Sequence, residues 1–393
     1  MAANGGATLD AGSHRPMSVQ HIGLVLWTGA TGGAEIFNVE LAKSFSREGR
    51  RVTVFFVGSP EPLMERLDNE GVAWYALGLP RGRGILLAGR RLAREINVRG
   101  CDAVITVAGG YLALALRTWG FRGVLVAQDH GSLLNRSVYG RVGAFVKLAE
   151  RVLDPYTLDA QVAVSAYMAG RVRRVPHARR LVVIPNGVDI ALYAARDVPG
   201  RRSTIRLGIA ARLVVGKGVE RLIQAVRNLR DDGVDVTCDI AGSGPLENAL
   251  RVECTDRGLD DAIAFRGRVK DMPAFWNSVD VCVAPSDGLV ESFGLSVAEA
   301  MACGRPTIVS DKGGLAELVE EGVTGWLVLP GDAGALAERI RWYVSHPAMI
   351  AVHGAAARDR ATKEWSLVRC ASRYLELVDS LACEHCIESQ SYT

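Results

Sequence analysis

The chain has 393 residues, 49% of them hydrophobic and 23% charged, which is typical of a soluble globular protein with room for two domains of about 150 to 200 residues. No apolar run approaches the ~18 residues of a membrane span, and the N-terminal stretch lacks the apolar core of a signal peptide. The composition therefore favours a cytoplasmic protein over a membrane-spanning or secreted one.

The cysteines support the same location. Eight are scattered along the chain without a disulfide framework, which fits reduced thiols in a reducing compartment. Cys383 and Cys386 form a CxxC that is at most half a zinc site, and we expect no structural role for it.

The net charge of +3 is unevenly spread. Residues 1–200 contain 24 Lys and Arg against 16 Asp and Glu, whereas residues 201–393 contain 22 against 27. Much of the positive excess lies in residues 81–100 and 170–180. A basic half could face anionic lipid at the inner face of the membrane, or an anionic acceptor. A solvated arginine-rich surface explains it equally well, and no nucleic-acid partner is expected.

Taken in chain order, the first 18 residues are expected to be a disordered tail. Short β-branched runs then alternate with amphipathic helical patterns, as in strand 21–27, helix 34–49 and strand 51–58, followed by strands 102–108, 123–129, 160–165 and 180–187. The alternation resumes with strands 204–211, 236–242, 262–267, 279–286 and 306–311, separated by helices at 218–230, 246–257, 273–278 and around Glu299. Apolar strands separated by such helices predict parallel sheets covered on both faces.

This alternation predicts an α/β fold with two doubly wound units. We expect an N-terminal domain over 19–190, a linker over 191–203 and a C-terminal domain over 204–360. A C-terminal helix over 361–382 is expected to cross back to the first domain, before a tail over 383–393. Such sheets bind ligands at the carboxyl ends of their strands.

Two glycine-containing loops follow strands. Gly32 and Gly33 open a helix after the first strand, where backbone can approach an anion closely. The spacing is GxxGG rather than the dinucleotide GxGxxG, and a tight turn without a ligand is an equal alternative. Gly242 and Gly244 follow a later strand; a nucleotide could approach there, but NAD binding is not supported.

Two further loops carry side chains suited to a sugar phosphate. Arg212 and Lys217 suit a diphosphate, although either alone is more often a surface charge. The chain has no Asp-x-Asp pair, so no metal is expected. His130, at the end of a strand, could bind a sugar hydroxyl or assist proton transfer, or could merely pack the loop.

The most informative segment is SDGLVESFGLSVAEAMACGRP, with Glu291 and Glu299 eight residues apart. Eight helical steps would separate them by about 12 Å, whereas a hydrolytic carboxylate pair needs roughly 5 to 10 Å. A helix that starts after Phe293 and Gly294 would instead aim its free N–H groups at an anion, with one glutamate on either side to hold hydroxyls. Alone, the pair could equally be surface glutamates at a helix start.

Together these residues resemble the family 4 retaining glycosyltransferases (glycosyl transferases group 1). The matching segments run in order along nearly the whole chain: TGGAEIFNVELAKSF, VIPNGVD, ARLVVGKGVERLIQA, IAGSGPLENAL, FRGRV and ESFGLSVAEAMACGRPTIVSDKGGLAELVEEGVTGWLVLPGD. The last contains the Glu-x7-Glu motif of that family. The resemblance implies the GT-B architecture, in which two Rossmann-like domains face each other across a cleft.

The resemblance also implies a role for each matching position. Glu291 would hold the donor sugar and Glu299 the ribose, alongside the backbone of Phe293, Gly294 and Leu295. The remaining positions divide by partner: Arg212, Lys217, Gly32 and Gly33 would meet the diphosphate, Gly242, Gly244, Arg266 and Gly267 would contact the base, and His130 would orient the sugar.

The activity implied is transfer of a sugar from a UDP- or GDP-sugar to a glycan, lipid-linked or small-molecule acceptor, without a cofactor or metal. The acceptor would attack from the face that the diphosphate leaves. Two alternatives stay open: a nucleotide-sugar epimerase of the same architecture, and a non-catalytic protein that binds sugar nucleotides. The donor sugar, the base and the acceptor are not specified by these motifs.

Overall fold

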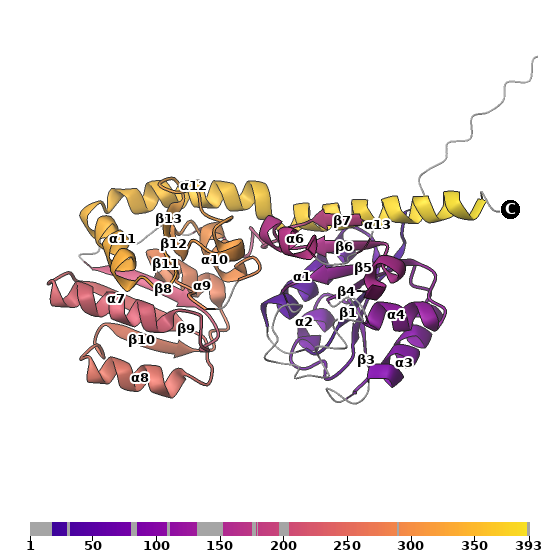
Figure 1. Cartoon of the computed structure of the whole chain (residues 1–393), viewed down its shortest axis with the longest axis horizontal. Helices are drawn as coiled ribbons and strands as arrows, with labels where there is room; N and C mark the ends of the chain where they lie inside the picture. The colour runs from indigo at the N-terminus through magenta and orange to yellow at the C-terminus, as the bar shows by residue number, and fades with distance from the viewer. Residues whose placement is uncertain are drawn as a thin grey trace, which may run out of the picture.

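The computed structural model describes residues 18–29, 32–79, 85–107, 111–131, 152–174, 178, 180–195, 204–288 and 291–390. Two lobes lie side by side, and two helices near the C-terminus run along one edge of both (Figure 1). The predicted tail over residues 1–17 and the linker residues 196–203 lie outside the described residues.

The first lobe contains a parallel sheet in the order β3-β2-β1-β4-β5-β6-β7. Its described strands are β1 (His21–Leu26), β2 (Arg51–Phe56), β3 (Ala73–Ala76), β4 (Ala103–Thr106), β5 (Val124–Asp129), β6 (Ala160–Ala163) and β7 (Arg180–Val183). The helices are α1 (Gly33–Arg47), α2 (Met64–Asp68), α3 (Ile85–Val98), α4 (Tyr111–Thr118) and α6 (Ala166–Val172). Every residue of β1 and β5 is buried, as expected for strands covered on both faces.

The second lobe repeats this plan with the order β10-β9-β8-β11-β12-β13. The strands are β8 (Ile205–Ala210), β9 (Val236–Ala241), β10 (Ile263–Gly267), β11 (Val281–Ala284), β12 (Thr307–Ser310) and β13 (Gly325–Val328). The helical segments of this lobe are α7 (Val219–Asp231), α8 (Glu247–Asp256), α9 (Met272–Ser278), α10 (Leu295–Ala302), η3 (Gly313–Leu315), α11 (Ala333–Ser345) and α12 (Ala348–Trp365). The last helix, α13 (Leu367–Gln390), returns to the first lobe. Two doubly wound parallel sheets confirm the predicted α/β fold class.

The strand orders locate the ligand-binding edge of each sheet. The order reverses between β1 and β4 in the first sheet and between β8 and β11 in the second. Loops that leave such a switch point diverge to opposite faces and open a crevice at the carboxyl ends of the strands. The loop from β8 to α7 carries Arg212 and Lys217, and the loop from β11 to α10 carries Glu291, so these candidates share one crevice.

The chain crosses between the lobes twice, and the two crossings are paired. Val188 accepts a backbone hydrogen bond from Leu367 (2.9 Å) and donates one to Trp365 (2.7 Å). A Cβ on Gly187 would lie 2.6 Å from the Cα of Leu367, so this close approach requires glycine. The glycine of the VIPNGVD segment, Gly187, therefore allows the two crossing segments to pack against each other.

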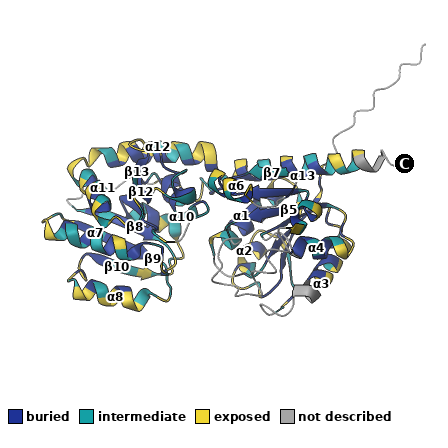
Figure 2. Ribbon diagram, viewed as in Figure 1, coloured by how far each residue is buried: buried dark blue, intermediate teal, exposed yellow. Residues whose placement is uncertain are grey.

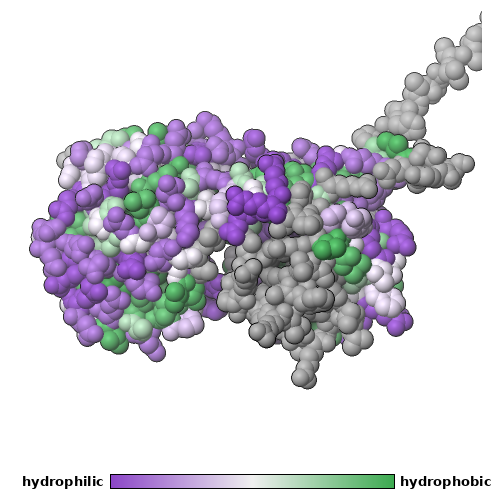
Figure 3. Space-filling model, viewed as in Figure 1, coloured by the Kyte–Doolittle hydropathy of each residue, from purple (hydrophilic) through white to green (hydrophobic). Residues whose placement is uncertain are grey.

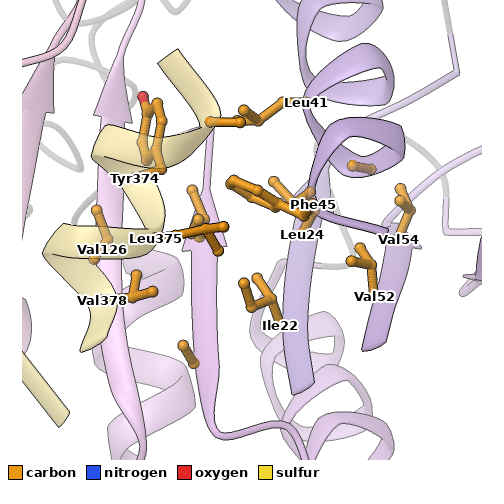
Figure 4. Close-up of a cluster of buried hydrophobic side chains, with 14 of the residues drawn as sticks. Ile22, Leu24, Leu41, Phe45, Val52, Val54, Val126, Tyr374, Leu375 and Val378 are labelled. Carbon is orange, nitrogen blue, oxygen red and sulfur yellow. The ribbon is translucent and has the colours of Figure 1, made fainter. Parts of the chain in front are cut away.

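After the second crossing, α13 packs on the first lobe. Its side chains, including Tyr374, Leu375 and Val378, join one buried cluster with Phe45 of α1 and residues of β1, β2 and β5 (Figure 4). Each fully buried aliphatic side chain contributes about 1.5 to 3 kcal/mol relative to exposure. The last helix therefore completes the core of the first lobe, although it follows the second in sequence.

The C-terminal segment differs from the sequence-based expectation. Residues 383–390, expected in a tail, continue α13, and His385 contacts Asp159 with Nε2 3.0 Å from Oδ1. Cys383 and Cys386 are therefore one helical turn apart, and neither is part of a disulfide. Side-chain contacts with the first lobe explain why the polar sequence stays helical here.

Buried residues are concentrated in the strands and on the inward sides of the helices in both lobes (Figure 2). The described residues on the face shown in Figure 3 are mainly hydrophilic with scattered hydrophobic groups. Among the described residues, no helix combines the length and hydropathy needed to cross a membrane.

Candidate active site

The helix α10 begins at the predicted position. Gly294 is its N-cap, with φ of 104°, a left-handed conformation that favours glycine. No side chain among the described residues caps this N-terminus, and its first turn contains no acidic residue. The turn that contains Phe293, Gly294 and Leu295 therefore leaves backbone N–H groups and the positive end of the helix dipole available to an anion.

Two charged side chains from different loops pair next to this turn, and a third lies on one of those loops. Lys217 forms a salt bridge with Glu291, although 74 positions separate them, and Ser286 Oγ lies 3.5 Å from the same carboxylate oxygen. Both members of the pair are partly buried. Arg212 is exposed, and its side chain makes no hydrogen bond or ion pair with other described residues. The crevice thus holds one neutralised pair and one arginine free to take a ligand.

Gly33 faces α10 from the other lobe. It begins α1, and a Cβ built on it would meet only Leu295 Cδ2, at 4.0 Å. Gly32 is the extended N-cap of the same helix, and its Cβ would meet the mobile end of the Glu35 side chain. The N-termini of α1 and α10 therefore approach each other across the cleft.

Glu299 lies deeper on α10. Its carboxylate contacts Trp276 Nε1 of α9 at 3.5 Å and the hydroxyl of Tyr193, which comes from the crossing segment. Burial raises the pKa of Glu299 to about 7, while Tyr193, Trp276 and Arg66 of α2 in the first lobe act in the opposite direction. This carboxyl is consequently close to half protonated at neutral pH.

His130 follows β5 on the first-lobe side. Its Nε2 lies 3.1 Å from Gln128 Oε1, and its ring makes an edge contact with Phe37 of α1 at 5.9 Å. Burial lowers the pKa of His130 to about 4, so the imidazole is neutral at physiological pH. A neutral imidazole can orient a hydroxyl, but it is a weak base.

The glycines predicted near the base have packing roles. The Gly242 N–H donates to the Gly267 carbonyl (2.7 Å), and a Cβ on Gly242 would lie 1.8 Å from the Ala211 carbonyl oxygen. A Cβ on Gly244 would lie 2.3 Å from the Leu213 carbonyl oxygen. These glycines hold the loop after β9 against the loop that carries Arg212. Contact of Gly242, Gly244 and Gly267 with a base stays a prediction.

The fourth residue of that group, Arg266, is occupied by an intramolecular pair. Its guanidinium binds the buried carboxylate of Asp239, with Nη2 2.8 Å from Oδ1. Its contact with a base likewise stays a prediction. Among the described residues, no group of three or more His, Cys, Asp or Glu side chains is arranged to hold a metal ion.

Sequence reasoning missed the contacts that join the two lobes beside Glu291. The Ser292 hydroxyl donates to the His130 carbonyl (2.8 Å), and the Ser165 hydroxyl donates to the Ser292 carbonyl (2.6 Å). The Glu317 carboxylate accepts from the Ala166 backbone N–H (2.9 Å) and from the next N–H of α6. A serine before a helix signals the cap at Ser165, but nothing in the sequence indicates that its hydroxyl also reaches the other lobe.

Two family models match the chain in tandem. One is described as Glycosyltransferase Family 4 and covers residues 31–192; the other is described as Glycosyl transferases group 1 and covers residues 204–346. The first match spans α1 to β7 of the first lobe, and the second spans β8 to α11 of the second lobe.

Curated relatives extend this similarity. The chain is 31% identical over 258 residues to the lipopolysaccharide core biosynthesis mannosyltransferase LpcC of Rhizobium leguminosarum bv. viciae, spanning 60% of this chain and 70% of the relative. It is 30% identical over 372 residues to a GDP-mannose-dependent alpha-(1-6)-phosphatidylinositol monomannoside mannosyltransferase of Mycolicibacterium smegmatis, spanning 88% and 87%.

A solved structure shows the fold. HepE of Anabaena, in complex with UDP and glucose, aligns with a TM-score of 0.78 at 22% identity, covering 92% of this chain and all of the other (100%). Together with the two parallel sheets, this likeness confirms the predicted GT-B architecture.

Proposed function

The chain belongs to the family 4 glycosyltransferases (glycosyl transferases group 1) and is a glycosyltransferase, and on that premise we propose that it transfers a sugar from a UDP- or GDP-sugar with retention of configuration. The observations that support the proposal lie at one cleft. Lys217 pairs with Glu291, just before the N-cap of α10, and Arg212 lies on the same loop as Lys217. A methyl group placed on Gly33 would lie 4.0 Å from Leu295 Cδ2 in the first turn of α10. A diphosphate fits such a set of backbone N–H groups and cations.

The proposed chemistry needs no protein nucleophile. The acceptor oxygen forms a bond to the anomeric carbon while the bond from that carbon to the diphosphate breaks, and the departing diphosphate takes the proton of the acceptor hydroxyl. Arg212, Lys217 and the first turn of α10 stabilise the charge that grows on the leaving group, an effect that is largest when the donors are already in place. Because two side chains supply positive charge, we propose that no metal is required.

The two glutamates hold the two ends of the donor in this proposal. Glu291 accepts from sugar hydroxyls once Lys217 turns toward the diphosphate, and Glu299 accepts from the ribose in its ionised form. The neutral His130 orients the sugar from the first domain. In this proposal, closure of the cleft brings these groups together. The hydrogen bonds of Ser292 and Glu317 between the lobes support it.

We propose a glycan, a glycolipid or a glycosylated small molecule as the acceptor, bound by the first domain. The named relatives support this class: one acts in lipopolysaccharide core biosynthesis and another on a phosphatidylinositol monomannoside. We further propose a cytoplasmic location with peripheral contact to anionic membrane, since Arg90, Arg91 and Arg94 are exposed on α3. Retention of the protein by anionic liposomes at low salt, and its release at high salt, would test the membrane contact.

A donor panel tests the proposed function. UDP- and GDP-sugars are screened by thermal shift and by slow hydrolysis, and the stabilising donor is then assayed with candidate glycan acceptors. A glycosyltransferase releases the nucleoside diphosphate much faster when acceptor is present and retains this activity in EDTA. An epimerase converts the donor without releasing a nucleotide, and a non-catalytic protein binds it without turnover, so either result would overturn the proposal.

A further inference from the structure

Gln128 is an uncharged polar side chain inside the first domain. It is 2% exposed, and its neighbour across the ladder is Val162 of β6. Alternate residues of a strand share a face, and Val126 and Val162 belong to the core cluster that includes α1 and α13. Gln128 therefore points into the layer between the sheet and these helices, where a polar group needs a partner.

The Gln128 amide has two polar neighbours. Its oxygen lies 3.1 Å from His130 Nε2. The side chain also lies close enough to the Tyr374 hydroxyl of α13 to oppose the rise that burial causes in the Tyr374 pKa. Tyr374 is fully buried and held edge-on against Phe45 at 6.4 Å. The amide therefore contacts the histidine through its oxygen, and the last helix packs a tyrosine beside the same side chain.

An amide oxygen can accept a hydrogen bond but cannot donate one. The contact with Gln128 therefore requires a proton on His130 Nε2, and in a neutral ring this leaves Nδ1 with a lone pair. From this geometry we infer that Gln128 is a positioning residue: it locks His130 in the Nε2–H tautomer, so that the ring can accept a hydrogen bond through Nδ1. Burial is the sole cause of the lowered His130 pKa, and no charged group contributes to it.

The functional consequence rests on the proposed function. If His130 orients the sugar, a fixed Nδ1 that accepts hydrogen bonds favours a sugar hydroxyl at that place. An ether oxygen or an anionic group there could not donate the hydrogen bond. The opposite tautomer would present an N–H hydrogen-bond donor at Nδ1 instead. A mixture of the two tautomers would weaken the selection for a hydroxyl. A purely structural role for Gln128, in which it only fills the core, predicts no control over the tautomer.

The tautomer is measured directly on the ligand-free full-length protein. Selective ¹⁵N-histidine labelling with long-range ¹H–¹⁵N correlation spectra distinguishes a protonated ring nitrogen from an unprotonated one, and the His130→Asn variant identifies the His130 signals. We expect a protonated Nε2 and an unprotonated Nδ1 at pH 7. A protonated Nδ1 in the unaltered protein would overturn the inference, whatever the outcome of the donor assays.

Substitutions separate positioning from core filling. Gln128→Leu should give a mixture of tautomers, and Gln128→Glu should give a ring protonated on both nitrogens, because a carboxylate favours the imidazolium. Gln161→Leu is the matched control, since Gln161 is also buried, on the adjacent strand β6 but on the opposite face. A His130 spectrum that stays unchanged in both Gln128 variants would contradict the role.

Two further measurements keep the test informative if Gln128→Leu folds poorly. Tyr374→Phe retains the ring and removes only the hydroxyl that faces the amide, so it should shift the tautomer ratio less than Gln128→Leu does. For the donor that the panel identifies, Gln128→Leu should lower kcat about tenfold, the value of one hydrogen bond, while Gln161→Leu leaves kcat unchanged. Equal losses in the two variants would indicate core damage and would overturn the positioning role.

Discussion

The two sheets share one winding, but the loops at their carboxyl ends differ in chemistry. The second sheet carries Arg212, Lys217 and Glu291 there, whereas the first presents an open glycine, Gly33, and a neutral histidine, His130. One domain thus supplies charge, and the other supplies room and uncharged hydrogen bonding. A ligand that satisfies both is anionic at one end and rich in hydroxyls at the other, as a nucleotide sugar is.

The largest effect is expected at the charged side of this comparison. Lys217→Ala removes one of two cations and leaves the Glu291 carboxylate unpaired, so kcat/KM should fall about 100- to 1000-fold, as when one preorganised group is lost from a charged transition state. Lys363→Ala is the matched control, because Lys363 is exposed on α12 and pairs only with Asp359 among the described residues. Steady-state kinetics with the identified donor provide the measurement. Equal activity of the two variants would remove Lys217 from the donor site.

Two glycines, Gly33 of the first domain and Gly242 of the second, are expected to respond differently to the same substitution. Gly33→Ala adds a methyl group that meets only Leu295, at the ordinary contact distance of 4.0 Å, so we expect an unchanged Tm and a donor affinity at least about tenfold lower, because the diphosphate loses its close approach. Gly242→Ala should behave in the opposite way: at φ of 133° and with a carbonyl oxygen 1.8 Å from the new Cβ, it should destabilise the fold by about 2 kcal/mol or more. Thermal unfolding and titration with UDP or GDP distinguish the two. Normal nucleotide binding by the Gly33→Ala protein would contradict the proposed contact between Gly33 and the diphosphate.

Glu299 predicts a pH dependence confined to the charged domain. Its pKa of about 7 lies above the ordinary glutamate range, so the buried acid favours the folded state fully below about pH 4.5 and loses that contribution as the pH rises toward 7. The pH dependence of ribose binding has the opposite sign, because binding uses the ionised carboxylate. Nucleotide affinity should therefore rise up to about tenfold between pH 6 and pH 8. Calorimetric titration of the unaltered protein and of Glu299→Gln tests this. The same slope in both proteins would exclude Glu299 as its source.

The smallest effect is expected where the domains touch. Glu317→Ala leaves two N–H groups of α6 without their acceptor, which should open the closed form and raise the donor KM about threefold while kcat changes little. Small-angle X-ray scattering should show a larger radius of gyration than for Glu338→Ala, an exposed site on α11. Identical scattering and KM values for the two variants would show that the Glu317 contact does not control closure.

Much of this arrangement was accessible from local patterns. β-Branched runs separated by amphipathic helices predicted both sheets, and glycine before an apolar helix predicted the start of α10. Short elements such as β13 carry too few residues for a periodic signal, and the polar end of α13 is helical because of contacts with a distant lobe. Local signals therefore predict elements better than they predict partners.

The site divides in the same way. Arg212, Lys217 and Glu291 could be nominated from loop position, but the Lys217–Glu291 pair joins residues 74 positions apart, and Tyr374 approaches Gln128 from the other end of the chain. The sequence could not distinguish glycines that face the ligand site from glycines required for packing. A Cβ on Gly33 would meet only a leucine side chain at 4.0 Å, whereas one on Gly242 would clash with a carbonyl oxygen, a difference that depends on neighbours no local pattern specifies.

A crystal structure with UDP or GDP, whichever stabilises the protein more, would locate the diphosphate in the cleft. We expect the diphosphate to lie between the first turn of α10 and Gly33, with a phosphate oxygen within hydrogen-bonding distance of Lys217 Nζ and the Lys217–Glu291 pair opened. A diphosphate bound away from both helix N-termini, with that pair intact, would contradict it.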